Sequence, residues 1–362
     1  MADRLFRFGI VAGTARDADQ WSKLARRAEE MGYATFLTPD TLGTLPPLLA
    51  LSAAAAATST LGLGSFVLSV ANRRPEQLAW EVNGLGMLSG GRFELGLGVG
   101  RPDAGKDAAR LGMPFGTVDQ RIRRLEEVIR QVRRWPGADG PHGDRPGADA
   151  PGTGRPGAVG SGTHRPRVDG SGTGRPATDG AGTGRPATDG AGTGRPATDG
   201  AGTGRPATDG AGTGRPATDG AGTGRPGAGG AGGPRVLIAA GGARMLGFAA
   251  RNADTVALGL PPSTSEDGLA DPVRLVRQAS DDFDRLELSV GVHVVGDEVP
   301  PWLAGRLGPD LPADSIAVLD GSPRQMADRL LRRRDAHQIS YITVNAMYAD
   351  RLAPVVELLS GA

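Results

Sequence analysis

The segment LSGGRFELGLGVG, residues 88 to 100, combines the end of a helix, a glycine turn and a buried strand. The helix begins at Pro75, because proline suits the first helical position, and the strand covers residues 92 to 99. Strands and helices alternate in the same way on both sides of this segment. Seven more strands are predicted at residues 6–12, 33–37, 61–70, 235–240, 255–260, 286–295 and 340–345. Eight strands that alternate with helices predict a parallel sheet closed into an α/β barrel of the (β/α)8, or TIM, type.

Helix signals support this alternation. Helices are predicted at residues 19–31, 47–58, 75–88, 117–135, 243–252, 322–336 and 350–359. Two of them open with a capping box, made by Thr117 with Gln120 and by Ser322 with Gln325. The arginine-rich runs at 121–124 and 332–334 fall inside predicted helices and are interpreted as solvated helix faces.

A decapeptide repeat, GTGRPATDGA, interrupts the pattern between the fourth helix and the fifth strand. We therefore divide the chain into residues 1–135 (first half of the barrel), 136–234 (insert) and 235–362 (second half). Without the insert about 260 residues remain, the usual size of a single barrel. The near-perfect copies contain no Leu, Val or Ile, so the insert is predicted to be disordered. Its position predicts an exit from the face opposite the active one.

Composition excludes several classes of function. The formal net charge of +1 argues against nucleic-acid binding, which needs a clustered basic face. The chain has no cysteine, which excludes disulfides, thiolate catalysis and Cys-ligated metal sites. No apolar run of about 18 residues is present, and the charged first residues do not form a signal peptide. These features predict a soluble, cytoplasmic protein that does not bind membranes.

In a barrel of this type the loops that follow the strands form the active face. Asp40 ends the second strand, where it could bind a ligand or cap the next helix. His293 could face the barrel mouth or be a structural histidine. Five residues that follow strands are predicted to line the pocket mouth, namely Thr41, Asn72, Arg101, His293 and Asn345.

The turn after the fifth strand carries a second signal. Gly241 and Gly242 lead directly into a helix that carries Arg244, so free backbone N–H groups and the positive helix end surround one point. This arrangement suits a phosphate, but a plain strand-to-helix turn would use the same glycines. No His, Glu and Asp cluster has metal-ligand spacing, and no nucleophile elbow is present. An enzyme of this kind is expected to use an organic cofactor.

Several blocks of sequence resemble the bacterial luciferase-like monooxygenase family. They are Phe8-Gly9, EEMGYATFLTPD (29–40), LGLGSFVLSVANRRP (61–75), LSGGRFELGLGVG (88–100), residues 124–135 and VLIAAGGARMLGFAARNAD (236–254). Members of this family use FMN or the deazaflavin coenzyme F420. The resemblance covers nearly everything except the insert, and it implies a flavin-type ring bound at the carboxyl ends of the strands.

By position, the resemblance assigns the cofactor to nine residues, of which the last four would hold its phosphate end: Asp40, Ser69, Val70, Val99, Gly100, Gly241, Gly242, Arg244 and Met245. The loops at 101–116 and 296–320 are expected to cover the pocket and to set substrate choice.

Two departures from the family bear on the reaction. The resembled deazaflavin dehydrogenases have a catalytic histidine where Thr41 stands and a glutamate where Arg101 stands. We therefore favour an FMN-dependent monooxygenase that oxidises a small organic substrate with O2. Hydride transfer with F420 is the closest alternative, and a flavin-binding protein without catalysis is the alternative of another class. A flavin reductase as electron source and a homodimer are the expected partners.

Overall fold

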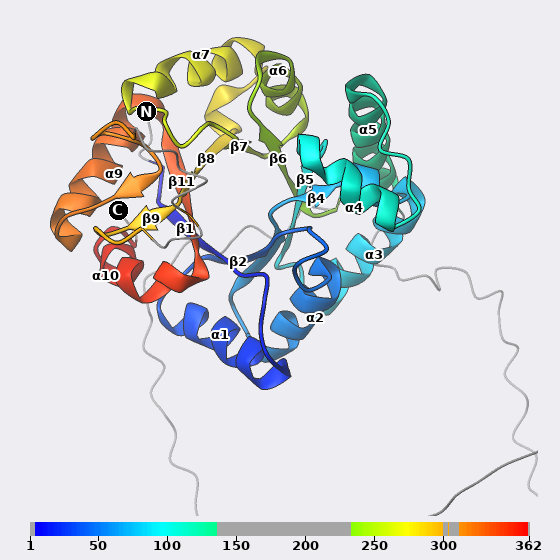
Figure 1. Cartoon of the computed structure of the whole chain (residues 1–362), viewed down its shortest axis with the longest axis horizontal. Helices are drawn as coiled ribbons and strands as arrows, with labels where there is room; N and C mark the ends of the chain where they lie inside the picture. Colours follow the sequence, from blue (N-terminus) through cyan, green and yellow to red (C-terminus); the bar gives the residue numbers. More distant parts are fainter. Residues whose placement is uncertain (1–3, 136–232, 300–302, 304–310, 361–362) are drawn as a thin grey trace, which may run out of the picture. The chain divides into compact units, whose positions relative to one another are not determined.

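The computed structural model describes residues 4–135, 233–299, 303 and 311–360, which belong to one compact unit. The strands of its main sheet are β1 (Arg7–Val11), β2 (Thr35–Thr38), β3 (Gly62–Ser65), β4 (Leu68–Ser69), β5 (Phe93–Gly98), β6 (Arg235–Ala240), β7 (Thr255–Leu258), β8 (Glu287–Val292) and β11 (Ile339–Asn345). All of their pairings are parallel, in the order β3-β2-β1-β11-β8-β7-β6-β5-β4. An additional pairing of β3 with β5 closes the ring (Figure 1).

This closed ring confirms the predicted (β/α)8 barrel. The strand predicted at 61–70 is divided into β3 and β4, because the chain leaves the sheet at Phe66 and Val67. The strand predicted at 286–295 is likewise divided into β8 and β9 (Val294–Val295), and β9 pairs with β10 (Val318–Leu319) outside the main sheet.

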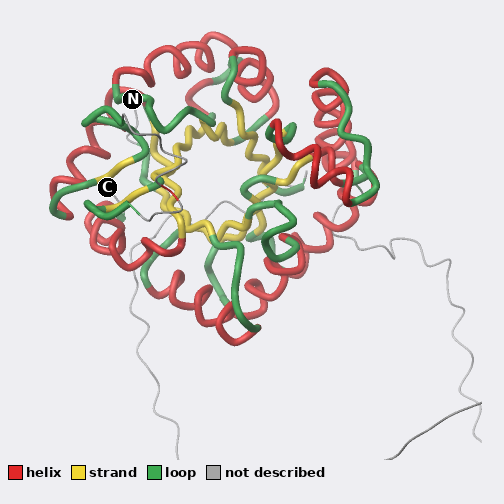
Figure 2. Tube along the Cα trace, viewed as in Figure 1, coloured by secondary structure: helices red, strands yellow, loops and turns green. Residues whose placement is uncertain are grey.

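Helices surround the ring of strands, as Figure 2 shows. They are α1 (Ala18–Glu30), α2 (Pro47–Ala57), α3 (Pro75–Leu88), α4 (Gly105–Arg110), α5 (Val118–Arg134), α6 (Ala243–Asn252), α7 (Ala270–Ala279), α9 (Pro323–His337) and α10 (Ala349–Leu359). Both predicted capping boxes are present, at the starts of α5 and α9. The sequence analysis missed the helices α4 and α7. Helix α4 has only 6 residues, whereas α7 was missed although Val273 and Val276 give it helical spacing.

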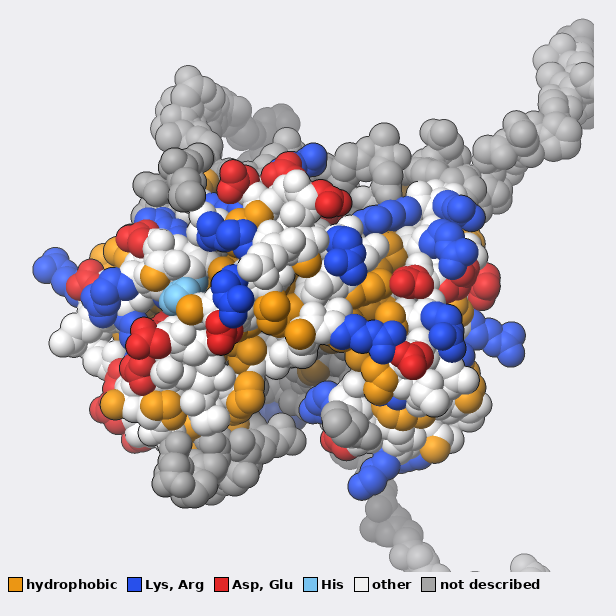
Figure 3. Space-filling model, turned by 90° about the horizontal axis from the view of Figure 1, so that it is seen from above, with side chains coloured by type: hydrophobic (Ala, Val, Ile, Leu, Met, Phe, Trp, Pro, Cys, Tyr) orange, Lys and Arg blue, Asp and Glu red, His pale blue; other side chains and the backbone are white. Residues whose placement is uncertain are grey.

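The insert begins after α5 and ends before β6, as predicted. Its residues 136–232 lie outside the described part of the chain, so the disorder predicted for them stays a prediction. Within the described residues, no helix is both long and apolar enough to cross a membrane. On the face drawn in Figure 3, basic, acidic and hydrophobic side chains are interspersed.

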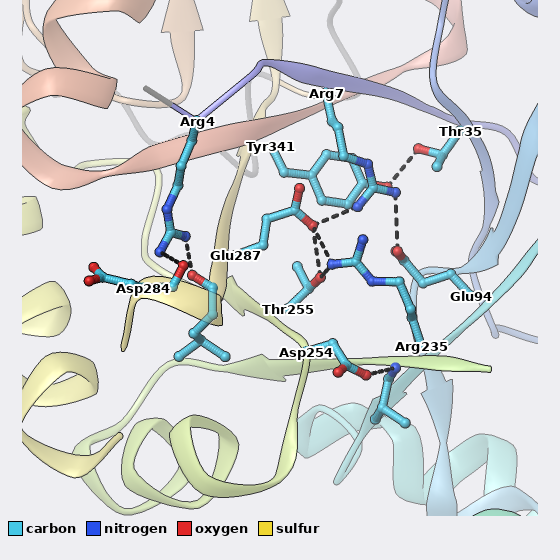
Figure 4. Close-up of polar contacts among 12 residues, drawn as sticks. Arg4, Arg7, Thr35, Glu94, Arg235, Asp254, Thr255, Asp284, Glu287 and Tyr341 are labelled. Atoms are coloured by element: carbon cyan, nitrogen blue, oxygen red, sulfur yellow. Dashed lines mark hydrogen bonds and ion pairs between the residues drawn. The ribbon is translucent and has the colours of Figure 1, made fainter. Parts of the chain in front are cut away.

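A network of charged side chains fills the barrel at the amino ends of the strands (Figure 4). The Arg7 guanidinium donates hydrogen bonds to Glu287 Oε2 (2.5 Å) and to Glu94 Oε2 (3.1 Å). Glu287 Oε2 also accepts from Thr255 Oγ1 (2.8 Å) and Arg235 Nη2 (3.4 Å). Burial alone would lower the pKa of Arg7, but the two carboxylates outweigh it and raise that pKa. These contacts tie β1, β5, β6, β7 and β8 together across the interior.

The Tyr341 ring covers the Arg7 guanidinium of this network. The Arg7 guanidinium lies 4.3 Å from the centre of the Tyr341 ring, and Tyr341 Oη lies 2.6 Å from Thr35 Oγ1. Gly9 leaves room for this contact, since a Cβ there would lie 2.6 Å from Thr35 Oγ1. Tyr341 is fully buried, and burial raises the pKa of its phenol. The ring therefore stays neutral at physiological pH, and the barrel is closed at this end.

The joint between β3 and β5 depends on a glycine. Ser65 Oγ donates to Gly96 O and accepts from Gly96 N–H, both at 2.9 Å, and so replaces ladder hydrogen bonds between the strands. A Cβ at residue 96 would lie only 1.8 Å from the Ser65 carbonyl oxygen. Only glycine permits this close approach, which places the chain after β3 next to β5.

We expect Gly96→Ala to lower the free energy of unfolding by at least about 2 kcal/mol, because the new methyl group overlaps backbone. Gly84→Ala in α3 is the matched control, since a Cβ there meets nothing within 4 Å. That change should leave the free energy of unfolding unchanged or raise it by up to about 1 kcal/mol. Urea unfolding of the two variants measures both effects, and equal stabilities would contradict the close approach.

Candidate functional site

The carboxyl ends of adjacent strands bring the predicted site residues to one edge of the barrel. The register pairs Ser69 of β4 with Gly98 of β5, and Ala240 of β6 with Leu258 of β7. Val99 and Gly100 follow β5, and Gly241 and Gly242 follow β6. The segments assigned to a cofactor are therefore neighbours around the mouth, although nothing in the structure tests their individual roles.

Asp40 is held by a group of donors rather than left open. Its carboxylate accepts two hydrogen bonds from Arg73, at 2.6 and 3.1 Å, and one from the Ser69 N–H at 2.9 Å. Asn72 Nδ2 lies 3.4 Å from the same carboxylate. These contacts show that Asp40 fixes the segment from Ser69 to Arg73. Direct contact of Asp40 with a cofactor ring stays a prediction.

Four buried side-chain atoms on the mouth side of the barrel have no hydrogen-bond partner within the described residues. They are Thr38 Oγ1, Ser69 Oγ, Asn72 Oδ1 and Ser289 Oγ. An unsatisfied buried polar atom costs about 1–3 kcal/mol. Three of these residues stand at the ends of β2 and β4, next to the predicted cofactor positions. A bound molecule with donor and acceptor atoms would satisfy them.

The start of α6 is open to a ligand. Gly242 is its N-cap and provides no side-chain cap for the first-turn N–H groups. Gly241 must lack a side chain, because a Cβ there would lie 2.5 Å from the Gly259 carbonyl oxygen of the next loop. Met245 is half-buried against the core. The backbone at this turn therefore presents donors and the positive helix end without side chains in front of them.

Arg244 is engaged by an acidic side chain. It forms an ion pair with Asp119 at the start of α5, and both side chains are more than half exposed. The pair places the amino ends of α5 and α6 side by side. The structure thus leaves the predicted phosphate contact of Arg244 untested, and the backbone of Gly241 and Gly242 is the better-placed part of this predicted set.

The remaining mouth residues differ in their surroundings. Val70 is fully buried, and Gly100 has a φ of +83° that favours glycine. Arg101 is exposed and lies 3.5 Å from Asp103, while Asn345 Oδ1 accepts the Met347 N–H at 3.0 Å. Thr41 is half-buried, and no side-chain contact of it is described.

The sequence analysis missed Arg121. The interpretation of the run 121–124 as a solvated face is wrong for this residue, which is only 9% exposed. Its Nε donates to the Val99 carbonyl (2.7 Å), its Nη1 donates to the Gly116 carbonyl (2.8 Å), and its guanidinium stacks 4.0 Å from the Phe115 ring centre. Arg121 therefore holds the end of β5 in place. The sequence signal that could have identified Arg121 is its position on the inward face of the predicted helix.

The run 332–334 contains a second buried arginine. Arg333 is 2% exposed, so the solvated-face interpretation is wrong here as well. It donates to both carboxylate oxygens of Glu266, at 2.9 and 2.6 Å, and Arg329 adds a third bond at 2.8 Å. Burial would raise the pKa of Glu266, but the two arginines outweigh it and lower that pKa. This cluster anchors the loop between β7 and α7 to α9.

A cavity of about 170 Å³ lies at the mouth over β6, β7 and β8. His293 borders it, and apolar surroundings lower the pKa of the imidazole although part of the ring stays open to solvent. Within the described part of the chain, no group of three or more His, Cys, Asp or Glu side chains could hold a metal ion. The described mouth therefore offers backbone donors, isolated polar atoms and a mainly apolar hollow.

Comparison with known proteins identifies related folds. A family model described as luciferase-like monooxygenase matches residues 5–203, more than half of the chain. A search of curated proteins returned no match. The chain is similar in structure to the coenzyme F420 dependent tetrahydromethanopterin reductase of Methanopyrus kandleri, with TM-score 0.58, 14% identity, and coverage of 99% of this chain and 98% of that one.

Two monooxygenases are similar to this chain in structure to about the same extent. One is the EDTA monooxygenase of a Chelativorans species, with TM-score 0.58, 14% identity and coverage of 98% of this chain and 94% of that one. The other is the oxygenating constituent of 3,6-diketocamphane monooxygenase of Pseudomonas putida in complex with FMN, with TM-score 0.57, 15% identity and coverage of 99% and 97%. At such identities these likenesses show the fold.

We expect a strong energetic coupling between Asp40 and Arg73, since both side chains are mostly buried. A double-mutant cycle with Asp40→Asn and Arg73→Gln should give a coupling energy of about 1–3 kcal/mol in urea unfolding. The exposed pair Arg27 and Asp350 is the control, and its cycle should give less than about 1 kcal/mol. Equal couplings for the two pairs would show that Asp40 does not organise the mouth.

Proposed function

The chain belongs to the luciferase-like monooxygenase family, and we propose that it oxidises a small organic substrate with O2 and reduced FMN bound at the carboxyl end of the barrel. The observation that carries this proposal is the set of unsatisfied buried polar atoms at the carboxyl ends of β2 and β4, namely Thr38 Oγ1, Ser69 Oγ and Asn72 Oδ1. The family match covers the whole first half of the barrel, which contributes Ser69 and Asn72 to that set.

The residues present fit a flavin. The uncapped first turn of α6 after Gly241 and Gly242 would hold the phosphate, because its N–H groups are free of side-chain caps. Ser69 Oγ and Asn72 Oδ1 would meet polar atoms of the ring, and the partly exposed Val99 would supply an apolar wall. Asp40, Arg73 and Arg121 would keep these segments in position through the hydrogen bonds described above.

Reduced FMN, when bound, supplies two electrons, so that one oxygen atom of O2 enters the substrate and the other leaves as water. The protein's own part is to hold the ring, to position the substrate beside it and to exclude water. The described mouth residues provide no strong acid or base for further chemistry, which fits a reaction in which the cofactor does most of the work. A flavin reductase is the proposed source of electrons. We also propose a cytoplasmic homodimer.

Hydride transfer with F420 is the second candidate. Its support is the similarity to an F420-dependent reductase and the presence of exposed arginines near the mouth, Arg101 and Arg244, which suit an acidic cofactor tail. Arg73, which would have joined them, is already paired with Asp40. Both available arginines also have acidic neighbours, so the observations favour FMN. A barrel that binds either cofactor without turnover would be a flavin-binding protein.

Gly242→Asp tests the phosphate position without harming the fold. An aspartate at this N-cap accepts hydrogen bonds from the first turn of α6, so the melting temperature should stay unchanged or rise. The same carboxylate occupies and repels the phosphate site, so the dissociation constant for FMN should rise at least about tenfold. Fluorescence quenching of FMN measures binding.

Gly242→Ala is the control, because a Cβ at this residue meets nothing within 4 Å and adds no charge. Its FMN affinity should stay within about threefold of the original chain's. If Gly242→Asp bound FMN as tightly as Gly242→Ala, the phosphate would not lie at this turn. Oxygen incorporation from labelled O2 into a substrate then separates oxygenation from F420 chemistry and from binding alone.

A further inference from the structure

The mouth cavity exists because three neighbouring strands present small residues to the barrel interior. Its inner wall is made of Ala239 on β6, Ala257 on β7, and Ser289 and Gly291 on β8. Alternate residues of a strand face the same side, so these positions all point inward. Leu37 and Tyr341 fill the interior next to these small residues, in one apolar cluster that includes Ala239 and Ala257. Phe66, from the segment between β3 and β4, also lines the hollow, which otherwise lies over β6 to β8.

The outer wall of the cavity is anchored. Pro261, Pro262, Ile316 and Ala317 line it. The Ile316 N–H donates to the Thr264 carbonyl at 2.9 Å, and Ser315 Oγ donates to the Pro262 carbonyl at 2.6 Å. The buried ion pairs of Glu266 with Arg329 and Arg333 fix the same loop to α9. This wall is built into the fold and does not require a ligand to form.

The residues that line the cavity offer few polar groups to a ligand. None of the described residues that line the cavity carries a formal charge at neutral pH, because the only titratable one is His293 and its surroundings lower its pKa. Ser289 is fully buried, and its Oγ has no hydrogen-bond partner in the described part of the chain. An anion would lose its hydration here without meeting a cation, whereas an oxygen of a neutral molecule could bond to Ser289.

We propose that this cavity binds the substrate and selects an uncharged, mainly apolar organic molecule whose single carbonyl or hydroxyl oxygen bonds to Ser289. The proposal rests on the proposed function and deepens it by naming the substrate class. A cavity of about 150 Å³ holds a benzene-sized molecule, so about 170 Å³ admits a body of that size. Of the assigned cofactor positions, Ser69 ends β4, Val70 follows it and Val99 follows β5, and none of the three lines the cavity.

Binding of three probes of similar size tests the selection: cyclohexanone, methylcyclohexane and cyclopentanecarboxylate. Ligand-observed NMR titrations are run on the full chain, with and without FMN. Cyclohexanone should bind at least about tenfold more tightly than the carboxylate. Ser289→Ala should weaken cyclohexanone binding by at least about threefold while leaving methylcyclohexane within about twofold. The matched control is Ser52→Ala on α2, which removes a hydroxyl bonded to the Leu48 carbonyl far from the cavity in the chain.

The variant Gly291→Val tests whether the probes bind in this cavity. A Cβ at residue 291 makes only ordinary contacts, at 3.5 Å to Thr343 Oγ1 and 3.6 Å to His293, so this variant should fold and fill the hollow. It should abolish binding of both neutral probes. Equal or tighter binding of the carboxylate, or undiminished binding to Gly291→Val, would overturn the proposal. Failure of the original chain to bind FMN would overturn the proposed function instead. The two failures can be told apart, because the relative affinities of the three probes are also measured without FMN.

Discussion

The shared ion pairs of Arg7 with Glu94 and Glu287 determine which end of the barrel can work as a site. A single guanidinium is clamped between carboxylates from β5 and β8, and Tyr341 covers it. Removing one partner from such a buried network costs about 3–5 kcal/mol, because the remaining charge is left uncompensated. The charges inside the barrel are thus gathered at its amino end. At the carboxyl end, the Asp40–Arg73 pair and Arg121 hold the segments around the mouth, and the cavity over β6 to β8 is lined by neutral polar and apolar residues.

Small residues shape that open end in two ways. Gly96 lets β3 and β5 approach closely enough for Ser65 to bridge them, which brings the segment from Phe66 to Asn72 against the end of β5. Ala239, Ala257 and Gly291 on the opposite strands leave space instead of filling it. The ends of β4 and β5 are therefore suited to contact with a flat ligand, and the cavity over β6 to β8 is suited to a small molecule next to that ligand.

Local sequence signals predicted the elements well. The capping boxes at Thr117 and Ser322 fixed helix starts, and the alternation of strands and helices predicted the closed barrel. Long-range partners were beyond such signals. Arg121 and Arg333 stand at inward positions of their helices, but only the fold brings the Val99 carbonyl and the Glu266 carboxylate to them. Similarly, the small residues on β6 to β8 form a cavity only when the register of three strands is known.

We propose above all that the carboxyl end of this barrel is a flavin site. Equilibrium titration of the purified full-length chain with FMN and with F420, followed by absorbance and fluorescence, tests it most directly. The structure predicts saturable one-to-one binding, with FMN bound more tightly than F420, since the mouth arginines are largely engaged by acidic side chains. Binding of neither cofactor would contradict the claim and leave only the barrel fold. Tighter binding of F420 would instead favour F420-dependent hydride transfer as the reaction at this site.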